Sequence, residues 1–291
     1  MRLVRENDGS RLMMWTLLTA LTSMCNVGQS SFTKMASGKG QATGAMRINA
    51  VKVGAAFLLF FLISFYRLQL HLPTVLFSAA YGLLLFGSNL FGYFALMSGS
   101  MAITSLIVSY SVLIPCVFGI TFLNESVTTF RIVGLVLLLT SMYFLRRKAD
   151  NDAKKSGRWL LYVVLTFLCN GAGSVLQKLH QTAYPGSYCN EFLLCALAVN
   201  LVLFALIAAG RREKARGGTV YAMVAGVLMG AANYLTLYLS AKVSASVLFP
   251  MITVFSALLN VTVSALVFKD KFTLRQGIGI FLGVVSVLLI K

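Results

Sequence analysis

Acidic residues are scarce in this chain of 291 residues, which has 8 Asp and Glu against 25 Lys and Arg. Charged residues of all kinds make up 11% of the sequence, hydrophobic residues make up 58%, and the mean hydropathy is +0.83. Soluble globular domains carry about 25% charged residues. The composition therefore excludes a soluble domain and indicates an integral membrane protein.

Histidine and cysteine are also few. The five cysteines lie in or beside apolar stretches, where a thiol behaves as a small hydrophobic group, and their spacing fits neither a zinc site nor a disulfide framework. His71 and His180 each stand alone near an expected loop, and no acid, nucleophile or metal ligand recurs at a useful spacing. We therefore expect no enzyme, no metal site and no cofactor.

The basic residues lie mainly in the connections between apolar stretches, so their first explanation is membrane topology. No basic helix or low-complexity arm points to nucleic acid as a partner. The connections opposite the chain ends carry more Lys and Arg than those on the same side, which by the positive-inside rule places both termini outside.

Long apolar runs are abundant. A helix needs about 20 residues to cross the hydrocarbon core, and these runs lack the polar alternation of barrel strands. The sequence therefore predicts an all-α, multi-pass integral membrane protein with ten transmembrane helices, near 12–34, 48–66, 74–97, 101–122, 128–145, 158–177, 188–209, 219–240, 245–267 and 272–290.

The chain repeats itself at a spacing of 144 residues. Residues 12–35 and 156–179 share eight identities in 24 aligned positions, including the only two tryptophans. We interpret this similarity as an internal duplication. The spacing holds for Asn89 and Asn233 and slips to 145 for Gly134 and Gly279. Because the first apolar stretch takes part in the repeat, we expect it to be retained rather than cleaved as a secretory signal.

Five crossings per copy is an odd number, so two directly joined copies enter the membrane in opposite orientations. The sequence thus predicts two inverted five-helix repeats, at 1–145 and 158–291, joined by a basic linker at 146–157. Inverted repeats are typical of secondary transporters, whose substrate sites lie near the membrane midplane where the halves meet.

A polar series recurs on the first helix of each copy. Positions four apart fall along one helix face, and such a stripe is expected to face a water-filled cavity or another polar group. We predict that these residues line a substrate path: Asn26, Gln29, Ser30, Lys34, Asn170, Ser174 and Lys178.

The two lysines also have a structural interpretation. Lys34 lies 23 residues after Arg11, about 34 Å along a helix, so its ammonium can reach the far interface without entering a cavity. Alternatively, Lys34 and Lys178 hold an anionic substrate at the two ends of the path.

A second set of candidate residues lies on the expected helices 74–97 and 219–240. Asn89 and Asn233 have aromatic neighbours, an arrangement that suits an organic solute with an apolar body. The same side chains could instead connect helices by hydrogen bonds. The predicted residues of this set are Asn89, Tyr93, Asn233, Tyr234 and Tyr238.

No carboxylate falls at the centre of an expected helix, which disfavours a proton-coupled exporter of lipophilic cations. Glu125 and Asp270 precede the fifth helix of each copy and are expected to cap it. Pro115 and Pro250 are expected to kink their helices.

These turns carry a family resemblance. Leu113-Ile-Pro115, Asn124-Glu125-Ser-Val-Thr128 and Gly134, with the weaker copy Phe268-Lys-Asp270-Lys-Phe-Thr273 and Gly279, resemble the drug/metabolite transporter superfamily and its EamA-like ten-helix members. The resemblance implies a carrier of small organic metabolites or drugs across the cytoplasmic membrane, often an exporter, with a central cavity formed by helices 1, 3, 4, 6, 8 and 9. It also implies cytoplasmic termini, in conflict with the distribution of basic residues.

Three functions are compatible with these observations. The first is a secondary transporter of neutral or zwitterionic solutes such as amino acids, by alternating access. The second is an exchanger of anionic metabolites such as nucleotide sugars or sugar phosphates. The third is a membrane partner protein without transport activity. In each case the lipid bilayer is a partner, and a monomer and a homodimer are both compatible with the sequence.

Overall fold

The computed structural model describes residues 2–37, 45–64, 68–69, 71–98, 101–125, 128–145, 157–210, 218–266 and 273–290, and every regular element in these ranges is a helix. Most of the expected linker, residues 146–156, and the expected cap Asp270 lie outside the described residues. The elements are α1 (Arg2–Ser37), α2 (Ala45–Ser64), α3 (Leu72–Ser98), α4 (Met101–Ser109), the 3-10 turn η2 (Tyr110–Val112), α5 (Leu113–Phe122), α6 (Thr129–Leu145), α7 (Gly157–Ala183), α8 (Cys189–Gly210), α9 (Thr219–Ser240), α10 (Ala245–Leu266) and α11 (Leu274–Ile290).

Six of these helices contain a stretch that is long and apolar enough to cross a membrane: Met46–Ser64, Leu72–Ala95, Gly157–Ala183, Cys189–Gly210, Thr219–Ser240 and Ala245–Val263. Three shorter apolar stretches accompany them, at Leu106–Phe122, Thr129–Leu145 and Leu274–Ile290. Large apolar side chains remain exposed on their outer faces, for example Leu62, Leu76 and Phe281. In a bilayer these faces contact lipid, and helices satisfy their own backbone hydrogen bonds there.

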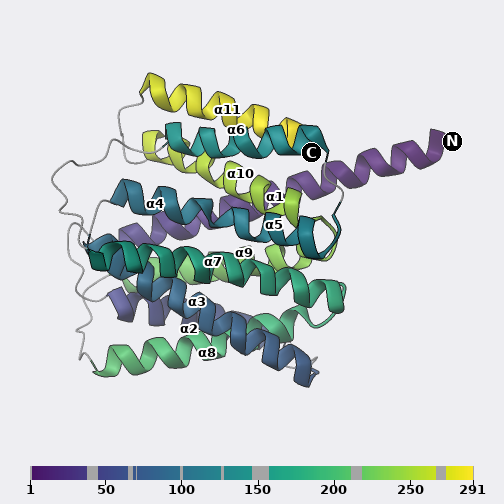
Figure 1. Ribbon diagram of the computed structural model, residues 1–291. Helices are drawn as coiled ribbons and strands as arrows, with labels where there is room; N and C mark the ends of the chain where they lie inside the picture. Colours follow the sequence, from purple (N-terminus) through teal and green to yellow (C-terminus); the bar gives the residue numbers. More distant parts are fainter. Residues whose placement is uncertain are drawn as a thin grey trace.

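The helices form three layers (Figure 1). α6 and α11 pack together on one flank, and α2 and α8 pack together on the other. Between them lie α1, α3, α7, α9, α10 and the continuous α4–η2–α5 segment. Each flank has its own apolar core, around Leu138 and Val287 on one side and around Phe204 and Leu197 on the other. The polar side chains discussed below belong mainly to the middle layer.

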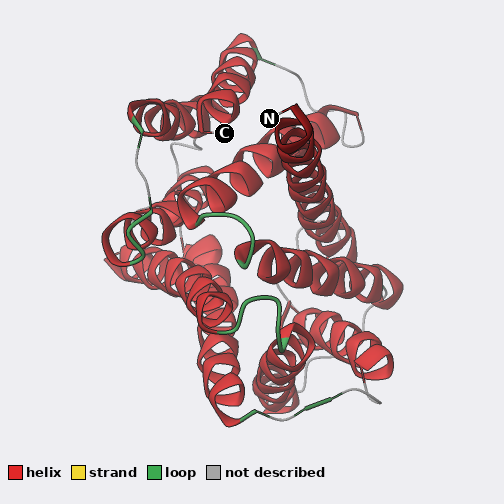
Figure 2. Cartoon of the chain, turned by 90° about the vertical axis from the view of Figure 1, so that its right-hand side faces the viewer, coloured by secondary structure: helices red, strands yellow, loops and turns green. Residues whose placement is uncertain are grey.

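Both chain termini lie at one end of the bundle (Figures 1 and 2). α7 ends there and α10 begins there, whereas α7 begins at the opposite end. We call the end that holds both chain termini the terminal end. We call the opposite end, where α7 begins, the linker end, because residues 146–156 precede α7 in the sequence. α1 runs parallel to α10, since Ser23 contacts Ile252 and Ser30 contacts Asn260.

The expected helix at 101–122 is divided. α4 passes through η2 into α5, and Pro115 lies in the first turn of α5. Proline has no N–H to donate to the carbonyl of Ser111, four residues before it, so the chain tightens locally into a 3-10 turn. Pro250, by contrast, lies inside an uninterrupted α10.

Glycines bring helices from different halves into close contact. A Cβ on Gly134 would collide with Ile290 of α11, and a Cβ on Gly279 would collide with Leu145 of α6. Gly226 of α9 lies against the Lys52 carbonyl of α2. Small residues that allow backbones to approach are a common basis of helix association in membranes.

The contact at Gly226 predicts a loss of stability in Gly226→Ala. The new methyl group would overlap backbone rather than a movable side chain, and such overpacking costs about 1–3 kcal/mol. Thermal unfolding in detergent should show a midpoint about 2–4 °C lower per kcal/mol. Gly157→Ala is the control, because no atom lies within 4 Å of its Cβ position. Equal midpoints for the two variants would contradict the close approach of α2 and α9.

Candidate functional site

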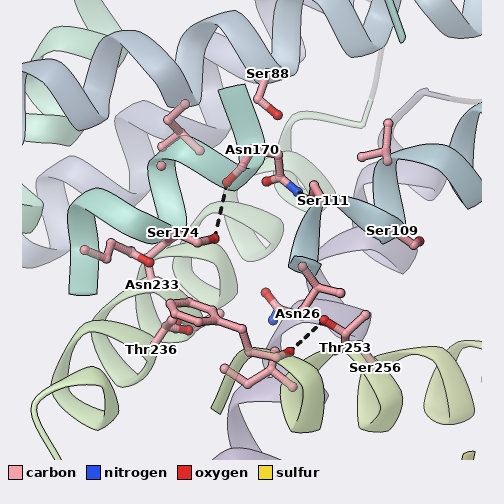
Figure 3. A pocket seen from close by; sticks show the side chains of 18 of the residues that line it. Asn26, Ser88, Ser109, Ser111, Asn170, Ser174, Asn233, Thr236, Thr253 and Ser256 are labelled. Carbon is pink, nitrogen blue, oxygen red and sulfur yellow. Dashed lines mark hydrogen bonds between the residues drawn. The ribbon is translucent and has the colours of Figure 1, made fainter. Parts of the chain in front are cut away.

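A cavity of about 410 Å³ lies in the middle layer, where α1, α3, α7, α9, α10 and the α4–η2–α5 segment meet (Figure 3). Apolar side chains such as Leu85, Val112, Met142, Phe249 and Ile252 form part of its wall. Every polar side chain in the wall is an amide, a hydroxyl or a thiol: Asn26, Tyr81, Ser88, Ser109, Ser111, Cys169, Asn170, Ser174, Gln177, Asn233, Thr236, Thr253, Ser256 and Asn260. The cavity therefore offers hydrogen bonds without a formal charge.

The cavity is open toward the linker end and closed toward the terminal end. Along α7, Asn170 is exposed, Ser174 is half-buried and Gln177 is only 4% exposed. Along α10, which runs in the opposite direction, Ser246 is buried and Asn260 is exposed. Both helices thus lose exposure as they approach the terminal end.

A hydrogen-bonded group closes the cavity at its deep side. The Tyr81 hydroxyl of α3 donates to the Asn233 side-chain oxygen at 2.7 Å and accepts from the Gln177 amide at 3.0 Å. These residues come from α3, α7 and α9, so the group joins one helix of the first half to two of the second.

A second polar contact crosses the halves at η2. The Asn170 amide donates to the Ser111 hydroxyl at 2.7 Å, and Ser174 donates to the Asn170 carbonyl one turn along α7. Ser111 lies in the 3-10 turn that precedes Pro115. The local tightening of the helix therefore places the hydroxyl against the cavity.

Glu125 and Lys178 lie beyond this floor. The Glu125 carboxylate accepts hydrogen bonds from the Ala245 and Ser246 backbone N–H groups and the Ser246 hydroxyl, at the start of α10. The expected role of Glu125 as the cap of the helix at 128–145 is wrong: it caps a helix of the other half. The reason is spatial, because the α5–α6 connection lies beside the start of α10.

Lys178 takes neither of its two expected roles. Its ammonium donates to the Ser240 and Val243 carbonyls, at the end of α9, and lies 3.8 Å from the Glu125 carboxylate. It is buried, so it does not extend to the interface, and it is not among the residues that line the cavity. Its repeat partner Lys34 is exposed and also lies outside the cavity wall.

The two histidines do not stand alone, contrary to the expectation from sequence. Thr74 joins them, with its hydroxyl 3.3 Å from His71 Nδ1 and 3.1 Å from His180 Nε2. Gln181 contacts the other nitrogen of His180, and Tyr188 stacks on His71. The group ties the start of α3 to the end of α7. Within the ranges that the structure describes, no three His, Cys, Asp or Glu side chains come together as a metal site.

The predicted residues divide into two groups. Asn26, Asn170, Ser174 and Asn233 line the cavity, and Ser30 contacts Asn260 at its rim. The other predicted residues are not among those that line it: Gln29, Lys34, Asn89, Tyr93, Lys178, Tyr234 and Tyr238.

The contacts of Asn89, Tyr93 and Tyr234 explain why these residues do not line the cavity. The Asn89 amide donates to the Leu85 carbonyl of its own helix. Tyr93 and Tyr234 pack against the apolar core around Phe204, where Tyr234 meets Phe60 at a ring distance of 5.8 Å.

Several lining residues were not predicted from the sequence. Tyr81 and Gln177 lie one or two turns from predicted positions, and Asn260 is the only amide side chain in α10. The position of Asn260 could have been predicted from the sequence, because an amide within a membrane helix is expected to face a cavity or another polar group.

Comparisons with known proteins agree with the family resemblance found in the sequence. Residues 157–291 match the model of the EamA-like transporter family. No curated protein matches the chain. The fold is similar to that of a protein of known crystal structure, with a TM-score of 0.76 and 16% identity over 95% of this chain and 97% of the other. The resemblance to the drug/metabolite transporters is confirmed, and the chain is a multi-pass membrane protein.

Tyr81 provides a test of the cavity floor. Tyr81→Phe removes the hydroxyl that links Asn233 to Gln177 and leaves the buried Gln177 amide without its described partner. A lost partner of this kind costs about 1–3 kcal/mol, so the midpoint of thermal unfolding should fall. Tyr221→Phe, at an exposed tyrosine, should leave it unchanged. Equal stability of both variants would contradict a hydrogen-bonded floor.

Proposed function

We propose that this chain, whose residues 157–291 match the model of the EamA-like transporter family, is a secondary transporter that moves small organic solutes across the cytoplasmic membrane. Neutral or zwitterionic metabolites such as amino acids are the proposed solutes, with related drugs as further candidates. Solutes bind in the central cavity, and the two halves expose it to each side in turn. The observation that carries the proposal is a cavity between the halves with an uncharged polar wall.

The shape and chemistry of the cavity support solute binding. A ligand site is usually a concave, partly apolar space of about 300–1,000 Å³ with a few polar groups that fix orientation. This cavity has amides and hydroxyls beside the Phe249 and Tyr81 rings. An amino acid or a molecule of similar size can bury its apolar part there and form hydrogen bonds with its polar groups. Asn26, Asn170 and Asn233 are the proposed binding residues from the predicted set.

The helix contacts support an inverted repeat of five helices. α1 packs on α9 as α7 packs on α3, and α2 packs on α9 as α8 packs on α3. If α1, α2 and α3 are exchanged with α7, α8 and α9, each of these contacts becomes the other contact of its pair. α1 runs parallel to α10, whereas Lys178 near the end of α7 lies beside the start of α10, so α1 and α7 run in opposite directions. We therefore propose ten membrane-crossing helices in two inverted sets.

The alternative functions have less support. An exchanger of anionic metabolites depended on Lys34 and Lys178 in the cavity, but neither lines it, and the Lys178 ammonium is bonded to carbonyls of α9 and the residues after it. A partner protein without transport activity has no use for a polar cavity that opens to one end. The family is one of carriers, and export is the proposed direction.

The repeat supplies a matched pair of variants to test the site. Asn233 and Asn89 occupy equivalent positions, and each amide donates to a carbonyl four residues earlier, but only Asn233 lines the cavity. Thermal unfolding against amino acids, nucleosides, sugars, sugar phosphates and lipophilic cations should identify solutes that raise the midpoint. For such a solute, Asn233→Ala should weaken binding about fivefold, the loss of about 1 kcal/mol, whereas Asn89→Ala should not.

The same solute should then exchange across proteoliposomes that contain the protein, and Asn233→Ala should slow this exchange. Stabilisation by sugar phosphates that disappears in Lys34→Ala with Lys178→Ala would instead support the anion exchanger. A solute that binds equally to both asparagine variants would place its site outside the cavity. Failure of every solute to exchange would support the partner protein.

A further inference from the structure

A buried ion pair lies between the closed side of the cavity and the terminal end. Lys178 Nζ and Glu125 Oε1 are 3.8 Å apart, and their side chains are only 11% and 9% exposed. Neither residue lines the cavity, so solute binding does not explain why they are charged. Two charges buried in a membrane protein are costly, and a buried ion pair is weak evidence for a gain in stability.

Glu125 joins the first half to the start of α10. One carboxylate oxygen accepts the Ala245 N–H at 2.6 Å, and the other accepts the Ser246 N–H at 2.9 Å and the Ser246 hydroxyl at 2.7 Å. The N-terminus of a helix has free N–H groups and a partial positive charge, so a carboxylate there is favourable. Glu125 follows α5, so these bonds fix α10 against the α5–α6 connection.

Lys178 completes the same junction from α7. Its ammonium donates to the Ser240 carbonyl at 2.9 Å and to the Val243 carbonyl at 2.8 Å. These carbonyls belong to the end of α9 and the turn into α10, where a cation is favourable. The pair therefore binds the whole α9–α10 turn, with one charge at each helix end.

The ends that meet at this pair are those that must separate if the cavity is to open toward the terminal end. α7, α9 and α10 all line the cavity on the linker side of the pair, and their residues become buried as they approach it. We propose that Glu125 and Lys178 are positioning residues that hold the cavity closed toward the terminal end, and that they separate in each transport cycle. This inference rests on the proposed function.

The chemistry of the pair suits a reversible contact. In the closed conformation each charge is compensated by its partner and by helix-end groups in a dry environment. When the junction opens, water enters and hydrates both charges, so the open conformation is not left with bare ions. An apolar contact of the same size would lack this compensation, because its separation would only expose hydrocarbon to water.

A natural thiol allows the closure to be measured. Cys169 of α7 lines the cavity, and a variant in which the other four cysteines are replaced keeps it as the single reactive site. In proteoliposomes, a membrane-impermeant maleimide is applied from one side at a time. With Glu125 and Lys178 present, Cys169 should react from the linker side and only slowly from the terminal side.

Glu125→Gln and Lys178→Met should each raise the rate of alkylation from the terminal side by about tenfold, because truncating one partner leaves the other charge buried and unpaired. Ser246→Ala removes one hydrogen bond to Glu125 and keeps both charges, so it should have a smaller effect in the same direction. It also keeps the test valid if the charge variants fold poorly. The control is Glu191→Gln, a buried carboxylate at the same end whose described bond is to the Gln69 N–H; it should leave the rate unchanged.

Unchanged alkylation from the terminal side in Ser246→Ala and in either charge variant, with the protein folded, would overturn the inference. An equal increase in Glu191→Gln would also overturn it, because general loosening would then explain the result. The alkylation rate requires no solute. Unchanged closure in the variants, with solute exchange by the unmodified protein, therefore refutes only the role of this pair. Weakened closure in the variants, without exchange of any solute by the unmodified protein, refutes the proposed function and with it the separation in each transport cycle, and leaves only the closing contact itself.

Discussion

A polar side chain inside a membrane protein needs either another polar group or the water of a cavity, and the middle layer, which holds the candidate site, depends on this constraint. The two flanking cores are mainly apolar, and the amides that line the cavity lie in the middle layer, although Asn200 of α8 is a buried amide without a described partner. Where the halves touch, these groups bond across the junction, as Tyr81 does with Asn233 and Gln177. Where they separate, the same kinds of group line the cavity. The cavity is thus the part of the junction where polar side chains surround a space instead of only one another.

The sequence predicted the helices, and it predicted four residues that line the cavity, because both follow from spacing. Apolar runs identify the helices, and the repeat of 144 residues identifies Asn26 and Asn170 as equivalent, and both line the cavity. The repeat also made Asn89 equivalent to Asn233, but only Asn233 lines the cavity. A cavity that is open at one end and closed at the other gives equivalent residues different surroundings, and a repeated sequence carries no signal of that asymmetry.

The sequence also failed to predict contacts between segments that are distant along the chain. Glu125 was expected to cap the helix that follows it, because that helix is nearest in sequence, but the start of α10 is nearer in space. His71 and His180, which appeared isolated along the chain, meet through Thr74 because α3 and α7 pack together. In each case the residue type indicated a need for a polar partner. Only the packing of the two halves determines which partner that is.

The central claim, that solute binds in the cavity between the halves, is tested most directly by protection of a thiol. Cys169 lines the cavity, whereas its repeat partner Cys25 is not among the lining residues. A solute that stabilises the protein should slow alkylation of Cys169 in proportion to its occupancy and leave alkylation of Cys25 unchanged. Unchanged alkylation of Cys169 at a saturating concentration of that solute would contradict the claim, because the solute would then bind elsewhere.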